Sequence, residues 1–535
     1  MEWDYIVIGA GSAGCAAAAP LVRAGRRVLV LEAGGSDRSW RIAIPAAVWR
    51  IQARHDWGYQ CEPDPTRNGI RDPLHRGRVL GGTSSINGML YVRGARGDFD
   101  RWAQQVGAKG AWSAAEVMPI FQALESSDQD QPQRGKNGAL HVRTVRRPHR
   151  VTRAFIEAAQ SAGHGFNQDY NAHDQAGVGY LQFTQHRGRR WSAADAFLRP
   201  LLNRANLKLL LHAMVERIET RSGRAEAVMF RYRGQRHRVC ARDIVICAGS
   251  INSPKILMLS GIGDPQELGR HGIAVEQALP AVGQHLRDHP LVQLTYRARV
   301  PTYNLTQGWL QRAAILWRYL RHREGPIGNA YEAAAFLKLT PHSALPEVQV
   351  FFAPIGWSAV GGRAQLTPYP AMKLVILCSH ARSSGRVRLS STDPAAPPLI
   401  EPRLLDDASD VRTLIEGAKA VRRIMQTEPM ADLVESEVTP GTSVQDDKAW
   451  QRFVGDNAEM SCHVMGTCRM GLSAAASVVT PDLRVHGMEN LWIADASIVP
   501  DAISANLNAP SIMIGTKLGK QLAARAGSSS GTAGD

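Results

Sequence analysis

His463 is the residue of greatest chemical interest, and it stands in a polar, glycine-punctuated segment at residues 461–467. An imidazole group titrates near neutral pH, so it can accept the proton of a hydroxyl group. A carbon that bears a hydroxyl group releases hydride readily only when that proton is removed. Because the chain has 17 histidines, position alone is weak evidence. His463 is a candidate general base for the oxidation of an alcohol, to be judged by its surroundings.

Asn508 is a second candidate, in the segment Asn506-Leu507-Asn508-Ala509-Pro510. A side-chain amide can donate a hydrogen bond to an oxygen on which negative charge develops, and so stabilise an alkoxide. The alternative is structural, because asparagine is a favoured helix N-cap and proline suits the first helical turn. Both roles are compatible with the sequence.

A glycine motif, Gly9-x-Gly11-x-x-Gly14, follows an apolar run near the N-terminus. Its glycines would allow a tight turn, a close approach to a pyrophosphate and contact between helix and strand. The N-terminus of the helix that follows would attract the pyrophosphate. Glu32, at the end of the next strand, would accept hydrogen bonds from ribose and repel a 2′-phosphate, which disfavours NADP. The motif does not separate NAD from FAD.

A second glycine cluster at residues 76–88 contains Gly81, Gly82, Ser84 and Asn87. Apolar residues alternate with the small ones, which disfavours a surface linker. Backbone N–H groups in such a loop suit a flat, phosphate-bearing cofactor.

This second cluster resembles the first motif of the glucose–methanol–choline (GMC) oxidoreductases. Residues 249–263, 282–290, 463–471 and 506–510 are similar to further motifs of that family, in the family's order. The resemblance runs from residue 4 to about 520. Within the family, the sequence most resembles the choline dehydrogenase-like branch of alcohol dehydrogenases and oxidases. It implies FAD as cofactor, His463 as base facing flavin N5, and Asn508 as donor to the substrate oxygen.

The resemblance also implies a set of FAD-binding residues. They are Gly9, Gly11, Ser12, Ala13, Gly14, Glu32, Ala33, Gly81, Gly82, Ser84, Asn87, Gly88, Met89, Leu90, Val215, Ala248, Asp495, Ala496, Asn508 and Ala509. Some choline oxidases attach FAD through a histidine where this chain has Ile86. Isoleucine cannot form that bond, so we expect non-covalent FAD.

Three residues are candidates for contact with the substrate: Glu332, Tyr331 and Phe351. In choline enzymes of the family, an acid near Glu332 and neighbouring aromatic rings hold the quaternary ammonium group. A solvated or structural acid is an equal alternative for Glu332, and core packing is an equal alternative for the two aromatic residues.

The composition limits which binding partners and which cellular compartment we expect for this protein. A net charge of +15 raises the possibility of nucleic-acid binding, but the basic residues are scattered, so we expect none. Seven dispersed cysteines show no metal-ligand spacing, which indicates a reducing compartment and no metal site. We expect a cytoplasmic protein without a signal peptide or an integral membrane segment, and a homodimer is compatible with the sequence.

The elements that would position these residues indicate an α/β protein. Residues 5–8, 13–24 and 28–31 form a βαβ unit typical of a Rossmann-like FAD-binding domain. That domain is expected to comprise residues 1–155, 196–300 and 459–525. Residues 156–195 and 301–458 would form a substrate domain (α+β) with an antiparallel sheet covered by helices, and residues 526–535 a disordered tail.

The favoured function is FAD-dependent oxidation of an alcohol to an aldehyde or ketone, with oxygen or another electron acceptor. One alternative is a redox-silent lyase, since the family includes flavoproteins that cleave cyanohydrins with the same histidine. Another is a nucleic-acid or regulatory binder that uses the nucleotide fold as a sensor.

Overall fold

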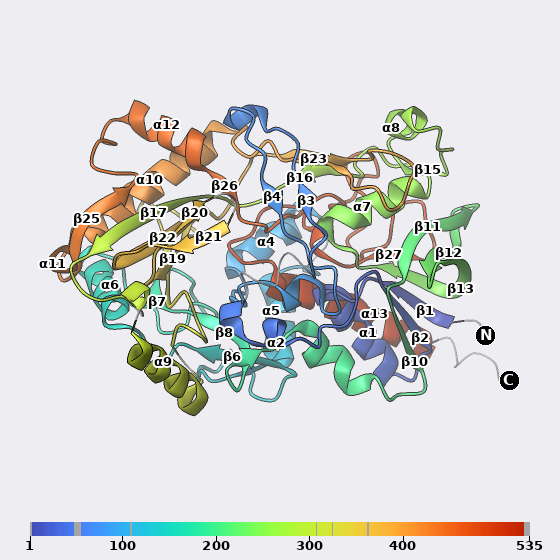
Figure 1. The fold of residues 1–535 in the computed structure, drawn as a ribbon. Coiled ribbons are helices and arrows are strands. Elements are labelled where there is room, and N and C mark those ends of the chain that lie inside the picture. The colour runs from blue at the N-terminus through green and yellow to red at the C-terminus, as the bar shows by residue number, and fades with distance from the viewer. Residues whose placement is uncertain are drawn as a thin grey trace.

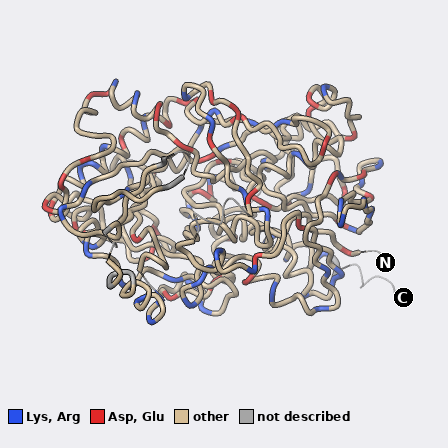
Figure 2. The backbone as a smooth tube through the Cα atoms, viewed as in Figure 1, with Lys and Arg blue, Asp and Glu red and all other residues tan. Residues whose placement is uncertain are grey.

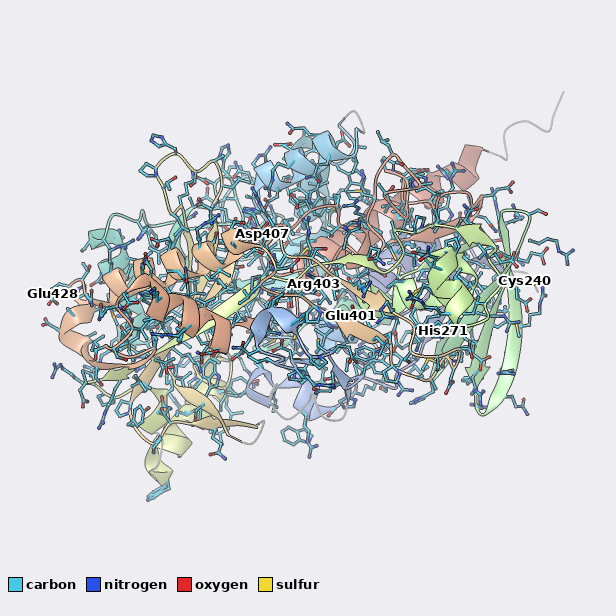
Figure 3. The ribbon with its side chains drawn as sticks, turned by 90° about the horizontal axis from the view of Figure 1, so that it is seen from above. Cys240, His271, Glu401, Arg403, Asp407 and Glu428 are labelled. Atoms are coloured by element: carbon cyan, nitrogen blue, oxygen red, sulfur yellow. The ribbon has the colours of Figure 1, made fainter. Side chains whose placement is uncertain are left out.

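The computed structural model describes residues 3–47, 55–107, 110–305, 308–323, 325–360 and 363–528. The molecule is elongated, with strands β1, β2 and β10–β13 toward one end and helices α6 and α10–α12 toward the other (Figure 1). Figure 3 shows Cys240 and Glu428 near these two opposite ends. We call the end with β1 the first lobe and the other end the second lobe.

The first lobe is built on parallel strands in the order β10-β2-β1-β13-β27. Their bounds are β1 Trp3–Ile8, β2 Val28–Glu32, β10 Leu207–Leu211, β13 Gln235–Ile246 and β27 Leu491–Ile493. β2 is buried throughout, which explains its unbroken apolar sequence. Strands β11 (Met214–Arg221) and β12 (Arg224–Tyr232) extend β13 as an antiparallel hairpin.

Helix α1 (Ser12–Arg23) packs closely against the C-terminal helix α13 (Asn508–Ser528). A Cβ atom on Gly515 would lie 2.2 Å from the carbonyl oxygen of Ala13, and one on Gly519 would lie 2.4 Å from that of Ala17. Glycine and alanine at these positions therefore let the two helix backbones approach each other. The contact joins the two ends of the sequence beside the first glycine motif.

The second lobe contains an antiparallel sheet in the order β25-β17-β22-β19-β18-β7, and β26 also pairs with β17. The bounds are β7 Gly177–Tyr180, β17 Pro290–Ala298, β18 Ala333–Leu337, β19 Val348–Ala353, β22 Ala371–Cys378, β25 Val434–Thr439 and β26 Glu459–Met460. Helices α6 (Arg150–Ser161), α10 (Ala408–Met425) and α12 (Asp447–Asn457) share an apolar core with one face of this sheet. The opposite face joins the core of the first lobe. The fold class expected from the sequence is confirmed.

The remaining elements connect and cover these two sheets. The helices are α2 Trp40–Ala43, α4 Arg96–Gln105, α5 Ala114–Leu124, α7 Gly249–Leu259, α8 Pro265–Arg270, α9 Trp309–His322 and α11 Met430–Leu433. The short strands include β3 Tyr59–Gln60, β4 Pro73–Leu74, β5 Glu125–Ser127, β6 Leu140–Thr144, β8 Gln182–His186, β9 Arg189–Arg190, β20 Trp357–Val360, β21 Arg363–Leu366, β23 Gly385–Arg388 and β24 Leu399–Glu401.

Two expected boundaries differ from the structure. Strand β17, inside the expected segment 196–300, belongs to the antiparallel sheet, so the chain enters the second lobe by Pro290. Helix α6 begins at Arg150, inside the expected segment 1–155, and packs on that same sheet. The chain crosses between the lobes near residues 146–150 and 284–289, which are polar like many other connections in this sequence, so composition does not mark these two crossings. Helix α13 reaches Ser528, so residues 526–528 are helical, and the rest of the expected tail lies outside the described residues.

Charged residues are spread over both lobes, with basic and acidic positions interspersed along the backbone (Figure 2). Within the described ranges, none of the helices has the length and apolar character needed to cross a lipid bilayer.

Candidate active site

A cavity of about 420 Å³ lies between the first lobe and the antiparallel sheet. Its walls come from the ends of β1 and β2, the loop at residues 82–90, the start of α7 and the segment 461–464. The sheet and the segment just before β18 contribute an apolar wall on the other side, formed by Leu291, Tyr331, Phe351, Val375 and Leu377.

The first glycine motif forms a turn at the head of this cavity. Gly9 has φ +96°, and a Cβ atom there would lie 2.6 Å from the carbonyl oxygen of Cys247. Helix α1 begins immediately afterwards, with Gly11 as N-cap and no side chain to accept hydrogen bonds from its first N–H groups. Such an uncapped helix N-terminus facing a cavity suits a pyrophosphate.

The second glycine loop packs directly on the first. Gly82 has φ +53°, and a Cβ atom there would lie 2.7 Å from the Cα atom of Gly11. Two backbones that are far apart in sequence thus meet without an intervening side chain. The contact makes a narrow backbone cradle beside the N-terminus of α1, which fits the phosphates of a dinucleotide such as FAD.

Gly82→Ala is expected to lower the FAD content of the purified protein at least tenfold, because the new methyl group must displace the backbone of Gly11 from the cradle. The ratio of flavin to protein absorbance measures this. Gly269→Ala is the matched control, since nothing lies within 4 Å of a Cβ atom at Gly269 in α8, and it should keep its FAD. Full FAD occupancy in Gly82→Ala would show that the cradle does not hold the cofactor.

Among the described residues, two acids line the cavity: Glu32 and Asp495. Both accept hydrogen bonds from backbone N–H groups. Glu32 accepts from the N–H groups of Ala10 and Gly34, each at 2.8 Å. Burial raises the pKa of Glu32 to about 7, against the opposing effect of these two N–H groups. Asp495 accepts from the N–H of Gly249 at 2.8 Å and so fixes the start of α7 against β27. Both acids therefore brace the glycine turns around the cofactor site.

Most of the residues expected to bind FAD line this cavity. They are Gly9, Gly11, Ser12, Ala13, Glu32, Ala33, Gly82, Asn87, Gly88, Met89, Leu90, Val215, Ala248, Asp495, Ala496 and Asn508. Four others, Gly14, Gly81, Ser84 and Ala509, lie behind the wall. Ser84 is buried and its Oγ donates to the carbonyl of Gly81 and accepts from the N–H of Ala193. These four would support the cradle from behind without lining it.

Tyr331 and Phe351 line the cavity, with ring centroids 6.0 Å apart, but Glu332 does not. The Glu332 carboxylate accepts from the N–H of His149 at 2.7 Å and the hydroxyl of Thr152 at 2.6 Å, both at the start of α6. Adjacent residues of an extended chain point to opposite sides, so Tyr331 in the cavity places Glu332 behind it. The expectation that Glu332 contacts the substrate is therefore corrected.

His463 lines the cavity and contacts two side chains through its two ring nitrogens. Its Nε2 lies 2.9 Å from Nδ2 of Asn506, and its Nδ1 lies 3.2 Å from Nδ1 of His289. Gln349 donates from Nε2 to Oδ1 of Asn506 at 3.3 Å, which orients the amide with its N–H toward His463. Nε2 of His463 is then an acceptor without a proton, and Nδ1 carries the proton toward His289.

Asn506, and not Asn508, is therefore the amide beside His463. Asn508 is the first residue of α13, and its Oδ1 accepts from the hydroxyl of Ser12 at 2.8 Å. This bond ties α13 to the N-terminus of α1, on the cofactor side of the cavity. The two asparagines of the 506–510 segment thus face different parts of the site.

Asp288 holds the segment that carries His463. Its carboxylate accepts from the N–H groups of Cys462 and His463, at 3.0 and 2.7 Å, and from the hydroxyl of Ser461 at 2.6 Å. Cys462 has φ +63°, a left-handed conformation that non-glycine residues rarely adopt. Asp288, His289 and His463 offer possible metal ligands within 4.8 Å of one another. The hydrogen bonds to Asp288 and between the two rings account for this cluster without an ion.

The protonation state of His463 follows from its surroundings. Burial holds the pKa of His463 well below its usual range, and the nearby His289 and Arg76 lower it further. The ring is therefore neutral near pH 7. Its Nε2 lone pair accepts a hydrogen bond from Asn506, and it can take a proton when the hydroxyl group of a substrate replaces that bond. Arg76 also donates to the carbonyl of Cys462, which brings its positive charge close to the histidine.

Several residues at the cavity were not singled out as candidates from the sequence. They are Trp57, Tyr59, His75, Arg76, Asn252, Lys255, Leu291, Val375, Leu377, Cys462 and Asn506, together with His289, which contacts His463 from behind. Asn506 and His289 lie inside motifs quoted for the family resemblance, so those motifs contained the signal. The apolar residues of β17 and β22 carry no such signal, because any buried strand has a similar sequence.

Comparison with known proteins decides the family. A family model for GMC oxidoreductases matches residues 3–291, and a second one, for the C-terminal part, matches residues 381–515. The chain belongs to the GMC oxidoreductase family. It is 39% identical over 539 residues to an oxygen-dependent choline dehydrogenase of Rhizobium johnstonii, covering 98% of this chain and 97% of that protein.

Solved structures agree with this assignment. Pyridoxine 4-oxidase from Mesorbium loti superposes with a TM-score of 0.89 at 29% identity, covering 97% of this chain and 99% of that one. A formate oxidase variant from Aspergillus oryzae shares the fold, with a TM-score of 0.90 at 23% identity and coverage of 98% and 99%. This GMC enzyme is an FAD-dependent alcohol oxidoreductase, and the lyase alternative is not favoured.

Proposed function

We propose that His463 is the base that takes the hydroxyl proton of the substrate alcohol, and that the amide of Asn506 donates to the same oxygen. The single observation that carries this proposal is the 2.9 Å contact between Nε2 of His463 and Nδ2 of Asn506 at the cavity wall. A proton acceptor and a hydrogen-bond donor that lie side by side can both reach one oxygen atom.

The reaction then divides between the chain and its cofactor. Nε2 of His463 accepts the proton of the hydroxyl group, while the N–H of Asn506 stabilises the negative charge that develops on the oxygen. FAD, when bound, accepts the hydride from the carbon, so that the alcohol loses one proton and one hydride and becomes an aldehyde or ketone. Gly9, Gly11 and Gly82 would hold the pyrophosphate, and Ile86 on the cavity wall leaves FAD non-covalent.

His289 is a positioning residue in this proposal. It is 1% exposed, and its Nδ1 faces the proton on Nδ1 of His463. By accepting a hydrogen bond from this N–H, His289 favours the tautomer of His463 that has no proton on Nε2, on the substrate side. Asp288, through its bonds to the backbone at Cys462 and His463, keeps the ring at this place.

The substrate side of the cavity favours a neutral alcohol with an apolar body. Its wall is formed by Leu291, Tyr331, Phe351, Val375 and Leu377. Glu332, which could have balanced a quaternary ammonium group, is bound to the start of α6 behind this wall. The names of the relatives refer to choline. Among the described residues of this cavity, however, no carboxylate lies on the substrate side to balance the positive charge of choline.

The experiment is anaerobic reduction of the flavin by choline and by its uncharged analogue, in which a carbon atom replaces the quaternary nitrogen. The two alcohols have the same shape, so their difference reports only the charge. We expect the uncharged analogue to bleach the flavin with a kcat/KM at least tenfold higher, because the cation loses its hydration without gaining an anion. A higher kcat/KM for choline would overturn the neutral-substrate proposal. If neither of these alcohols nor any other alcohol bleached the flavin, alcohol oxidation itself would be overturned.

The acceptor, the compartment and the assembly are further parts of the proposal. Mixing reduced enzyme with air in a stopped-flow instrument tells oxygen from another electron acceptor. All seven cysteines are free thiols, which supports the reducing environment of the cytoplasm. A homodimer in solution is proposed as well, to be measured by light scattering.

A further inference from the structure

Helix α9 (Trp309–His322) presents an apolar face to solvent. Trp309, Leu316, Trp317 and Leu320 are exposed by 76%, 51%, 64% and 57%. At about 100° per residue, these four side chains fall within an arc of roughly 100° on one side of the helix. Figure 1 shows α9 projecting from the body of the second lobe, below β7 and α6. The exposed face is therefore the one directed away from the protein.

The other side of α9 holds the helix to the protein by few contacts. Tyr319 is buried and its hydroxyl donates to the carbonyl of Gly188 at 3.0 Å. Arg318 donates to the carbonyl of Arg147 at 2.7 Å. In a helix on the surface of a soluble protein, the apolar stripe normally packs on the core and polar residues face water. Here the arrangement is reversed, and exposed apolar patches of this kind mark interaction sites.

We propose that α9 docks this protein on an anionic phospholipid surface, lying in the plane of the interface with Trp309, Leu316, Trp317 and Leu320 in the acyl boundary. Tryptophan is the side chain most typical of the membrane–water interface, and leucine supplies apolar area below it. The sequence of the helix has no acidic residue, and Arg321 lies beside the apolar arc, whereas Arg318 is bound to the carbonyl of Arg147 on the side that faces the protein. The chain as a whole carries +15, which adds attraction to an anionic surface.

The charge pattern selects lipid over a second copy of the chain. Two copies that paired α9 against α9 about a twofold axis would bring their arginines together without an acid from the helix between them. An anionic headgroup layer instead provides negative charge at the depth of Arg321 while the apolar side chains enter the lipid. The docking does not depend on the reaction proposed above.

The position of α9 gives this docking a consequence for the active site. The chain continues from α9 through the turn at residues 325–328, where Gln185 donates to the carbonyl of Gly328 at 2.9 Å. A few residues later comes Tyr331, whose ring lines the cavity. A docked α9 would hold this wall of the cavity close to the bilayer, where alcohols that partition into lipid are concentrated.

The test is flotation of the FAD-loaded enzyme with vesicles of phosphatidylcholine containing one quarter phosphatidylglycerol, compared with pure phosphatidylcholine. We expect wild type to float with the anionic vesicles at low salt, and less with the neutral ones. The double variant Trp317→Ser/Leu320→Ser should bind at least tenfold more weakly, since it removes apolar area from the exposed face. Leu472→Ser is the matched control, because Leu472 is 68% exposed near Gly107 and not on α9, and it should float like wild type.

Flavin reduction by a dissolved alcohol is measured on the same samples and should be unchanged, which separates failure of docking from failure of the proposed reaction. Arg321→Glu should weaken binding to the anionic vesicles alone, and it provides an independent variant if the double variant folds poorly. Absence of wild-type binding, or equal binding by the α9 variants, would overturn the proposal. A dimer of wild type in light scattering that becomes a monomer in the double variant would also overturn it and assign the face to a second copy.

Discussion

His463→Ala is expected to slow anaerobic reduction of the bound flavin by an alcohol by about 10²- to 10⁴-fold, while the protein still binds FAD. The variant loses the nitrogen that we propose accepts the hydroxyl proton, so hydride would have to leave a neutral alcohol. The ring of His463 forms its hydrogen bonds with Asn506 and His289 and not with the glycine cradle, and FAD retention should therefore not change. The rate is read from the loss of flavin absorbance in a stopped-flow instrument, and the FAD content from the absorbance ratio.

His271→Ala is the control for this experiment. His271 ends helix α8 in the first lobe, away from the cavity wall, and Figure 3 labels its position. It should reduce its flavin at the wild-type rate. If His463→Ala also reduced its flavin at that rate, His463 would not be the base. If His463→Ala lost its FAD, the residue would belong to the cofactor site and the geometric assignment would need revision.

Asn506→Ala and Asn508→Ala should distinguish the roles of the two asparagines, because one variant should change the rate of flavin reduction and the other the retention of FAD. Asn506→Ala removes the N–H that we propose donates to the substrate oxygen beside His463, and flavin reduction should slow by about 10²- to 10³-fold, as for other donors to a developing oxyanion. Asn508→Ala removes the acceptor of the Ser12 hydroxyl and should chiefly weaken FAD retention. The FAD that remains bound to Asn508→Ala should be reduced at a nearly normal rate.

Each variant is the control of the other, because both replace the same side chain within one short segment. The rate constant is measured at saturating alcohol, so that altered substrate affinity does not mimic a lost donor. The opposite result, a slow Asn508→Ala with normal FAD and a fast Asn506→Ala, would restore Asn508 as the donor to the substrate oxygen.

The glycine-rich elements of the first lobe were predictable because local sequence dictates them. An apolar strand, a glycine turn and a helix of small residues at 5–24 leave few alternatives to a βαβ unit. The structure has β1 and α1 in these places, with Gly9 in a conformation that other residues rarely adopt. The contact of Gly11 with Gly82 was not predictable in the same way, because it joins two loops through the packing of the whole lobe.

The direction of individual side chains at the substrate end was decided by the tertiary structure. Tyr331 and Glu332 are neighbours in sequence, yet one lines the cavity and the other bonds to α6. Sequence proximity to a motif cannot tell them apart, since the side of a sheet on which a residue lies depends on the register of that sheet with its partners. The exposed face of α9 is a similar case, because its periodicity is equally typical of a helix that packs on a core.

The sequence by itself determined the family, the cofactor and the presence of His463, because ordered motifs along the whole chain specify which residue types meet FAD and an alcohol. The tertiary structure decided which amide stands beside that histidine, and it chose Asn506 over Asn508. It also brought His289 to Nδ1 of the ring and the carboxylate of Asp288 to the backbone N–H of His463. The physical reason is that hydrogen bonds act over about 3 Å between segments joined only by folding, and the spacing of residues along the chain does not encode that distance.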